Sequence, residues 1–250
     1  MTHKLSVVII AYNEEENIGR CIDSVQEIAD EVLVVDSFST DRTVEIAMAK
    51  GARVVQHKFE GHIQQKNCAK EQAAFDYVFS IDADEELSSE LKQSILSLNK
   101  NFAVDGYTVN RLNFYCGKPV KTCGWYPDTK LRLWNRMEGE WRGTNPHDKF
   151  ELAAGSSVLH LTGDLLHNTY PTRESFLLQR EKFADISAQH LKGENALYLL
   201  WKMIFSAPFK FIRSYIFKLG FTEGTTGLFI CYRQSREVFQ KYFRALKLKF

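Results

Sequence analysis

The feature that most constrains the fold is a pair of short apolar runs that each end in an acidic residue. Residues 77–81 lead directly into Asp82-Ala83-Asp84, and residues 31–35 lead directly into Asp36. Short continuous apolar runs are typical of strands buried on both faces. Because open α/β sheets bind ligands beyond the carboxyl ends of their strands, the two acidic ends predict one polar crevice. Two carboxylates one residue apart can hold a hard divalent cation there.

Strand-like and helix-like segments alternate through the first hundred residues. Gly51 is placed to end the second helix as a C′ glycine, and Ser88 is placed to cap the fourth. This alternation predicts an α/β fold with a mostly parallel sheet and helices on both faces. We expect strands at residues 5–11, 31–35, 52–55 and 77–81, and helices at about residues 18–25, 42–50, 63–74 and 89–98.

The rhythm changes after residue 100. We expect extended strands at residues 106–115, 129–134 and 156–161, with a Gly/Trp/Arg-rich stretch at residues 138–143. From about Thr172 the pattern is helical to the end of the sequence. The chain is therefore expected to form an α/β domain over residues 1–165, followed by a helical C-terminal extension over residues 166–250.

The net charge of +1 conceals an asymmetry between the two parts of the chain. Residues 201–250 carry ten Lys and Arg against two acids, so the first 200 residues carry 22 against 29. Thirteen aromatic residues accompany those cations. Helices with aromatic and basic faces lie at the surface of anionic membranes, and this composition predicts a membrane-peripheral region. The alternatives are a helical cap on the core or a dimer contact with solvated cations. No nucleic-acid partner is expected, because the front of the chain is acidic and no such motif occurs.

Several function classes lack their key sequence element. The five cysteines are scattered without a CxxC pair, so neither a zinc site nor a disulfide framework is indicated. No GxGxxG after a strand, P-loop or GxSxG is present, which argues against dehydrogenases, NTPases and hydrolases. No stretch approaches the roughly 18 apolar residues that span a bilayer, and no cleavable signal pattern opens the sequence. We expect a cytoplasmic protein that is peripheral at the inner membrane.

Three sequence blocks together resemble the inverting nucleotide-sugar glycosyltransferases of family 2, which have the GT-A fold. The blocks are SVVIIAYNEE at residues 6–15, VVDSFSTDRT at residues 34–43 and SIDADE at residues 80–85. They occur in order and with typical spacing, and the resemblance covers about the first 165 residues. Three later segments look like the subgroup that adds glucose or related sugars to the lipopolysaccharide inner core: YPDTKLRL at residues 126–133, LHNTY at residues 166–170 and the tail at residues 211–227.

The resemblance implies transfer of a hexose from a nucleotide diphosphate sugar, such as a UDP-sugar, to a glycolipid or oligosaccharide acceptor. It implies that Asp84 binds Mg²⁺ or Mn²⁺, which offsets charge on the leaving diphosphate. His147 would complete the coordination or orient the diphosphate. The donor-binding positions implied are Ala11 and Tyr12, through their backbone groups, and the side chains of Glu14, Asp36, Lys66, Asp82 and Asp84.

Simpler structural roles stay open for several of these residues. Asp36 would equally serve as a loop cap, Lys66 as a solvated helix residue, and His147 as an ordinary loop residue. Trp125 and Trp141 would either stack on sugar faces or pack in the core.

The acceptor hydroxyl needs a general base, and Asp148 is the candidate. The subgroup usually has His-Glu where this chain has His147-Asp148. The shorter carboxylate requires the acceptor to lie about one methylene closer. Two rival functions remain at this point. One is transfer to a polyprenyl phosphate or a capsule precursor, where the acceptor anion needs no base. The other is a non-catalytic nucleotide-sugar or membrane-binding protein, which has little need of the Asp82/Asp84 pair.

Overall fold

The computed structural model describes residues 3–144 and 147–249, apart from the side chain of His147. The chain divides into two compact units. Unit 1 consists of Met1–Arg111 and Asp128–His167, and unit 2 consists of Leu112–Pro127 and Asn168–Phe250. Each unit is described by itself below.

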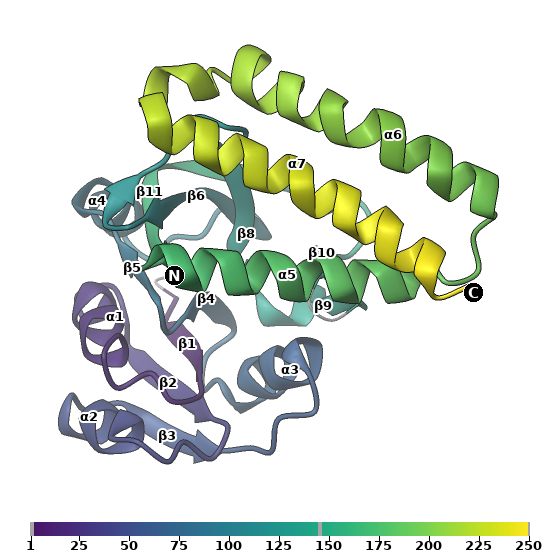
Figure 1. Ribbon diagram of the computed structural model, residues 1–250. Coiled ribbons are helices and arrows are strands. Elements are labelled where there is room, and N and C mark those ends of the chain that lie inside the picture. Colours follow the sequence, from purple (N-terminus) through teal and green to yellow (C-terminus); the bar gives the residue numbers. More distant parts are fainter. Residues whose placement is uncertain (1–2, 145–146, 250) are drawn as a thin grey trace. The chain divides into compact units, whose positions relative to one another are not determined.

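Unit 1 begins with strands that alternate with helices (Figure 1). The predicted strands and helices of this region are confirmed, and their bounds differ from those expected by one or two residues at most. In chain order the elements are β1 (Leu5–Ala11), α1 (Ile18–Val25), β2 (Glu31–Asp36), α2 (Thr43–Ala49), β3 (Arg53–Gln56), α3 (His62–Gln72), β4 (Tyr77–Asp82), β5 (Glu85–Leu87) and α4 (Ser89–Ser97).

The main sheet is parallel in one half and mixed in the other. Strands β3, β2, β1 and β4 are neighbours in that order and all parallel. The sheet continues through β8 (Asp128–Asn135), β6 (Gly106–Tyr115), β11 (Val158–Tyr170) and β5. The pairs β4–β8, β6–β8 and β5–β11 are antiparallel, and short β7 (Lys118–Pro119) pairs with the end of β6. Strand β11 runs well past its predicted end at residue 161.

A separate two-stranded hairpin follows the 3₁₀ turn η1 (Arg136–Glu138). It consists of β9 (Gly139–Thr144) and β10 (His147–Leu152). The sequence pattern marked this region as Gly/Trp/Arg-rich but did not indicate a strand. The reason is that β9 contributes a single buried apolar side chain, Trp141, to the core.

The core of unit 1 lies on both faces of the parallel strands. Along β1, Val7 and Ile9 pack toward Ile22 of α1, whereas Val8 packs with Ala69 of α3 on the other face. Figure 1 shows α1 and α2 on one side of these strands and α3 on the other. Fully burying one such side chain contributes about 1.5–3 kcal/mol. The expected α/β class with helices on both faces is therefore confirmed, and the continuous apolar runs are explained by burial from two sides.

A glycine lets β11 pass close to the start of α4. Gly163 has a φ of +91°, and a Cβ there would lie 2.2 Å from the backbone nitrogen of Leu91. The hydroxyl of Ser88 accepts a hydrogen bond from that same nitrogen, which confirms its predicted capping role. Through this close approach β11 reaches β5, where His167 lies opposite Glu85.

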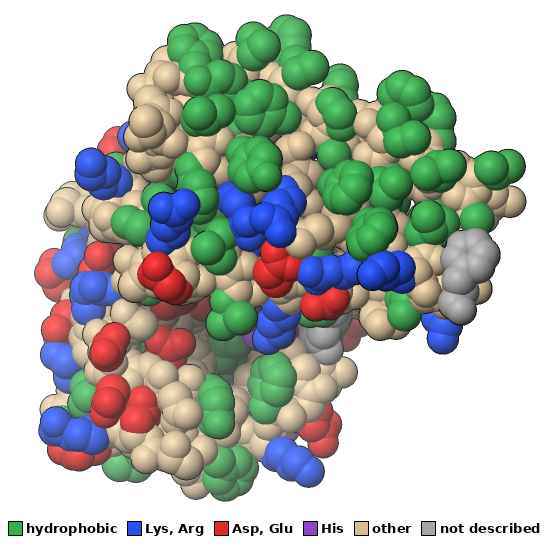
Figure 2. Space-filling view, viewed as in Figure 1, with side chains coloured by type: hydrophobic (Ala, Val, Ile, Leu, Met, Phe, Trp, Pro, Cys, Tyr) green, Lys and Arg blue, Asp and Glu red, His purple; other side chains and the backbone are tan. Residues whose placement is uncertain are grey.

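Unit 2 is mainly helical, as the pattern after Thr172 predicted. Its helices are α5 (Arg173–His190), α6 (Ala196–Ile212) and α7 (Gly224–Lys247), with a π turn η2 (Arg213–Phe217) and a 3₁₀ turn η3 (Gly220–Glu223) between the last two. Helix α7 packs against both α5 and α6 (Figure 1). Hydrophobic side chains gather on the surface over α6 and α7 (Figure 2). None of the helices in the described part of the chain combines the length and the apolarity that crossing a membrane requires.

Candidate active site

The loops that follow β1 and β2 are joined by hydrogen bonds. The carbonyl of Ala11 accepts from the backbone N–H of Ser37 at 2.9 Å. Asn13 donates its backbone N–H to the Ser39 hydroxyl at 2.9 Å, and its side-chain oxygen accepts from the N–H of Thr40 at 2.8 Å. Asn13 has a φ of +53°, a conformation that Asn tolerates better than most residues. The two loops form one connected rim, and sequence reasoning did not indicate the role of Asn13.

Three of the residues predicted to bind the sugar donor lie on this rim. Ala11 and Asp36 are paired across β1 and β2, and Tyr12 is exposed beside them. The buried carboxylate of Asp36 accepts hydrogen bonds from the backbone N–H of Ser39, at 3.0 Å, and from its hydroxyl. Asp36 thus makes the loop-cap contacts that were its alternative role. A carboxylate has further lone pairs, so its contact with a donor stays a prediction.

Glu14 connects the rim electrostatically with the end of β4. Its carboxylate accepts from the side-chain amide of Asn17 at 2.7 Å. Burial raises the pKa of Glu14, and the negative charges of Asp84 and Asp82 act in the same direction. The loop after β1 and the acidic triplet therefore belong to one polar region, as the strand ends predicted.

Asp82 is held between two cations at the carboxyl end of β4. Its Oδ2 lies 3.3 Å from Arg132 Nη2, and its Oδ1 lies 3.3 Å from Lys66 Nζ. Within the described part of the chain, no group donates a hydrogen bond to the buried Oδ1. Burial by itself raises the pKa of Asp82, but the charges of Lys66 and Arg132 outweigh it and hold that pKa well below its usual range. The carboxylate is therefore ionised, with one oxygen still able to accept.

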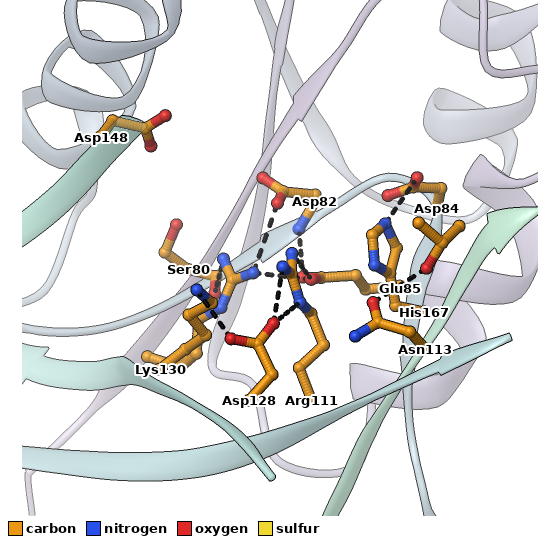
Figure 3. Close-up of polar contacts among 12 residues, drawn as sticks. Ser80, Asp82, Asp84, Glu85, Arg111, Asn113, Asp128, Lys130, Asp148 and His167 are labelled. Carbon is orange, nitrogen blue, oxygen red and sulfur yellow. Dashed lines mark hydrogen bonds and ion pairs between the residues drawn. The ribbon is translucent and has the colours of Figure 1, made fainter. Parts of the chain in front are cut away.

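A buried ion-pair network supports Asp82 from beneath (Figure 3). Glu85 and Arg132 are only 2% and 3% exposed and lie 2.6 Å apart. Arg111 lies 3.4 Å from Glu85 and 2.8 Å from Asp128. Glu85 also accepts from the backbone N–H of Asp82 at 3.0 Å, which fixes the turn after β4. Sequence reasoning assigned none of these supporting residues, although Asp128 and Arg132 lie in the segment that resembles the family.

Lys66 bridges two predicted site residues. It is only 8% exposed, and its Nζ lies 2.9 Å from Asp148 Oδ2 as well as near Asp82. The same ammonium lies 4.5 Å from the centre of the Trp141 ring. The alternative of a merely solvated Lys66 is therefore wrong. The structure brings the candidate base and the acidic triplet together through this one side chain.

Side chains of helix α3 also form hydrogen bonds with the hairpin that carries Asp148. Asn67 exchanges two hydrogen bonds with the main chain of Trp141, one donated and one accepted, each 3.0 Å long. Lys70 donates to the carbonyl of Gly139 at 3.2 Å. The position of the candidate base thus depends on polar residues of α3 that sequence reasoning did not single out.

Both tryptophans proposed for sugar stacking pack against protein side chains. The ring of Trp141 is buried 5.6 Å from Trp134 and 5.9 Å from Phe150. Trp125 packs 5.4 Å from Tyr170 within unit 2. Trp141 is therefore a buried core residue, and Trp125 is partly buried against the core of unit 2.

Asp84 pairs with a histidine that had no predicted role. Its Oδ2 lies 3.1 Å from Nε2 of His167, and its side chain remains 33% exposed (Figure 3). His167 belongs to the segment LHNTY, but only the pairing of β11 with β5 reveals its neighbour. The predicted metal contact of His147 lies outside the described residues. Among the residues that the structure describes, no group of three His, Cys, Asp or Glu side chains is close enough to hold a metal ion alone.

Comparison with known proteins decides the family. Residues 6–156 match the model of Glycosyl transferase family 2. This chain belongs to glycosyl transferase family 2. The family expected from the three sequence blocks and the GT-A fold are both confirmed.

Relatives extend the likeness beyond that segment. The uncharacterised glycosyltransferase RP128 of Rickettsia prowazekii (strain Madrid E) is 49% identical over 241 residues, which cover 90% of this family 2 chain and 80% of RP128. The lipopolysaccharide core biosynthesis glycosyltransferase LpsC of Rhizobium meliloti (strain 1021) is 27% identical over 263 residues. The match covers 98% of this chain and 94% of LpsC. Among solved structures, glucosyl-3-phosphoglycerate synthase of Mycobacterium tuberculosis, in complex with Mn²⁺, UDP and glucosyl-3-phosphoglycerate, is 20% identical. The match covers 74% of this chain and 78% of that one, with a TM-score of 0.46.

Proposed function

We propose that this glycosyltransferase moves a hexose from a UDP-sugar or related donor to the lipopolysaccharide core or a related envelope glycolipid. Glucose is the hexose that we propose first. The observation that carries the proposal is the Lys66 bridge, which joins Asp82 at the strand end to the carboxylate of Asp148. The Lys66 ammonium thus contacts both a carboxylate of the proposed donor site and the candidate base. The likeness to LpsC, whose name assigns it to lipopolysaccharide core biosynthesis, supports the acceptor class.

We propose Asp84 and His167 as the residues that hold Mg²⁺ or Mn²⁺. Their side chains already lie 3.1 Å apart, and Asp82 Oδ1, which pairs with Lys66 but accepts no hydrogen bond from a described group, belongs to the same turn. Magnesium is commonly held by one or two carboxylates together with substrate phosphates and water, so two protein ligands fit such a site. When bound, the cation supplies charge compensation for the leaving diphosphate.

The rim formed by the loops after β1 and β2 is our proposed site for the nucleoside. Ala11 and Tyr12 would face the base through backbone groups, while Glu14 and Asp36 accept from ribose hydroxyls or base N–H groups. The Oδ1 of Asp82 is a further acceptor for ribose or for a water molecule, because no described group donates to it.

Asp148 is our candidate for the general base. It takes the proton of the acceptor hydroxyl, whose oxygen bonds to the anomeric carbon as the bond from that carbon to the diphosphate breaks. Attack from the face opposite the leaving group inverts the configuration. In the structure the Lys66 ammonium occupies this carboxylate, 2.9 Å from its Oδ2. We therefore propose that donor binding draws Lys66 away from Asp148 toward the diphosphate, which leaves the base free when the acceptor arrives.

With such an acceptor, we propose that the enzyme works at the cytoplasmic surface of the inner membrane, and we propose no nucleic-acid partner. The rival acceptors, a polyprenyl phosphate or a capsule precursor, bring their own anion. They predict that Asp148 is dispensable. The rival of a non-catalytic binding protein predicts nucleotide binding without any transfer.

The first experiment is calorimetric binding of a panel of nucleoside diphosphates, with and without Mn²⁺, to wild type and to Asp84→Ala. We expect Mn²⁺-dependent binding of UDP that the substitution abolishes. Absence of binding to every nucleotide would overturn the proposal. Transfer of labelled sugar to extracted lipopolysaccharide core then separates a transferase from a binding protein.

A further inference from the structure

Helix α6 exposes its most apolar side. Leu197, Trp201, Phe205 and Phe209 recur every four residues, so they lie on one face of the helix. All four are exposed, Leu197 to 77% and Phe209 to 65%. The opposite face, which includes the buried Leu199, packs within unit 2. An ordinary surface helix shows the reverse arrangement, with polar residues turned outward.

The exposed apolar surface extends beyond this stripe. It continues into the segment after α6 and onto α7, whose own exposed side chains are spaced as one helical face (Figure 2). We call the whole surface the apolar face of unit 2. Its members are Leu197, Trp201, Ile204, Phe205, Phe209, Ile212, Ile216, Phe217, Leu219, Phe221, Leu228, Tyr232, Phe239 and Phe243. Contiguous exposed apolar surfaces of this kind mark protein or membrane contacts.

The charged residues of α6 and of the segment that follows it have one sign. Residues 195–222 contain no Asp or Glu, and their charged residues are Lys202, Lys210, Arg213 and Lys218. The ammonium of Lys202 lies 5.2 Å from the centre of the Trp201 ring, so its stem follows the apolar surface. Figure 2 shows a row of Lys and Arg side chains along one border of the green surface. An apolar face bordered by cations complements anionic lipid headgroups.

The dimensions favour a helix that lies in the membrane plane. The 17 residues of α6 span about 25 Å, less than the roughly 30 Å of a bilayer core, and Pro208 interrupts the helix near its end. A second copy of the chain fits this face less well. A two-fold contact through α6 would set like charges beside each other, because residues 195–222 carry four cations and no acid to pair with them.

We propose that the apolar face of unit 2 inserts into the interfacial layer of an anionic bilayer, with α6 parallel to the surface. The proposal deepens the proposed function and rests on the part of it that places the enzyme at the inner membrane. It identifies the element that makes the contact and the lipid class that this element selects.

The test is co-sedimentation of the full chain with vesicles. Wild type is mixed with vesicles of phosphatidylcholine alone or with about a third of phosphatidylglycerol, at low and high salt. The double variant Phe205→Ser/Phe209→Ser removes two exposed rings. Leu178→Ser on α5 is the control, because Leu178 is 75% exposed, more than Phe205 or Phe209, but lies outside the apolar face. Circular dichroism and thermal unfolding confirm that each variant folds.

We expect wild type and Leu178→Ser to bind the anionic vesicles, and the double variant to bind at least about tenfold more weakly. Added salt should weaken wild-type binding. Equal binding of the double variant, or no binding by wild type, would overturn the proposal. A wild-type dimer that the double variant dissociates, without vesicle binding, would assign the face to a second copy.

Calorimetric UDP binding without vesicles separates this proposal from the transferase proposal. The double variant should bind UDP as wild type does, because its changes lie outside unit 1. Vesicle binding without nucleotide binding would leave the membrane face standing while the transferase chemistry failed.

Discussion

The ammonium of Lys66 lies 2.9 Å from the carboxylate of Asp148, a residue 82 positions later in the sequence. The same ammonium is 3.3 Å from Asp82, so it separates two carboxylates in a largely buried region. Removing either partner of a buried ion pair leaves an uncompensated charge, which costs more than the pair itself contributes. This arrangement gives unit 1 a stability that depends on the same residues as its proposed chemistry.

Lys66→Met should destabilise the protein by about 3–5 kcal/mol, because two partly buried carboxylates lose the buried cation that they share. Urea unfolding measures the loss. The charge-preserving Lys66→Arg should recover part of it. A Lys66→Met variant as stable as wild type would show that the bridge is not populated in solution.

Asp148→Asn should lower kcat by about 10²–10⁴-fold, because the amide cannot take a proton from the acceptor. UDP binding should be kept or become tighter, because Asp148 no longer holds Lys66 away from the diphosphate, and calorimetry checks this on the same samples. Asp148→Glu, the residue usual in the similar subgroup, should retain most of the activity. Transfer by Asp148→Asn at the wild-type rate would favour an anionic acceptor that needs no base.

His167→Ala should weaken Mn²⁺-dependent UDP binding by at least about tenfold, because Asp84 loses its partner at the proposed metal site. Binding of UDP in the presence of a chelator should not change. His160→Ala is the control, since His160 is exposed and contacts Thr108 instead. Equal Mn²⁺ dependence in wild type and His167→Ala would remove His167 from the site.

Asn67→Ala should reduce kcat more than UDP affinity, because the Asn67 side chain fixes the main chain of Trp141 in the hairpin that carries the base. Loss of two hydrogen bonds to main-chain groups should also cost about 1–3 kcal/mol of stability. Gln72→Ala, an exposed position on the same helix, is the control. Equal losses in the two variants would assign the effect to α3 as a whole.

Asp128→Asn should change the pH dependence of unfolding. Burial raises the pKa of Asp128, but the Arg111 and Lys130 charges outweigh it and lower that pKa below its ordinary 3.8. A lowered carboxyl pKa stabilises the fold above the unfolded value, and this stability is lost as pH falls through the folded value. The difference in Tm between wild type and Asp128→Asn should be full at pH 7 and shrink below about pH 4. A difference independent of pH would contradict an ionised Asp128.

The parallel half of the sheet could be predicted because burial on both faces leaves a continuous apolar run, as in β1 and β4. Gly51 and Ser88 marked helix ends for equally local reasons. The hairpin was missed because β9 has only Trp141 to bury. Its pairing with β10 is a matter of backbone hydrogen bonds that side-chain patterns do not record.

The polar contacts of the site could not be predicted from spacing. Asp82 and Asp84 were indicated because they directly follow a buried apolar run, which is a local property of the sequence. The partners Arg132 and His167 come from strands β8 and β11, and only the strand order brings them to the acidic triplet. Sequence separation carries no information about which of several Arg or His residues the sheet will place there.

The hydrogen bonds that join Asn13 to Ser39 and Thr40 have a consequence for how a nucleotide is recognised. Loops that are already tied to each other lose little conformational freedom when a ligand arrives, so less of the binding energy is spent on ordering them. If the rim binds the nucleotide as we propose, that end of the site is preformed. In the proposed mechanism the moving part is the cationic side chain of Lys66, and the donor is engaged by a local exchange of salt bridges without a loop folding over it.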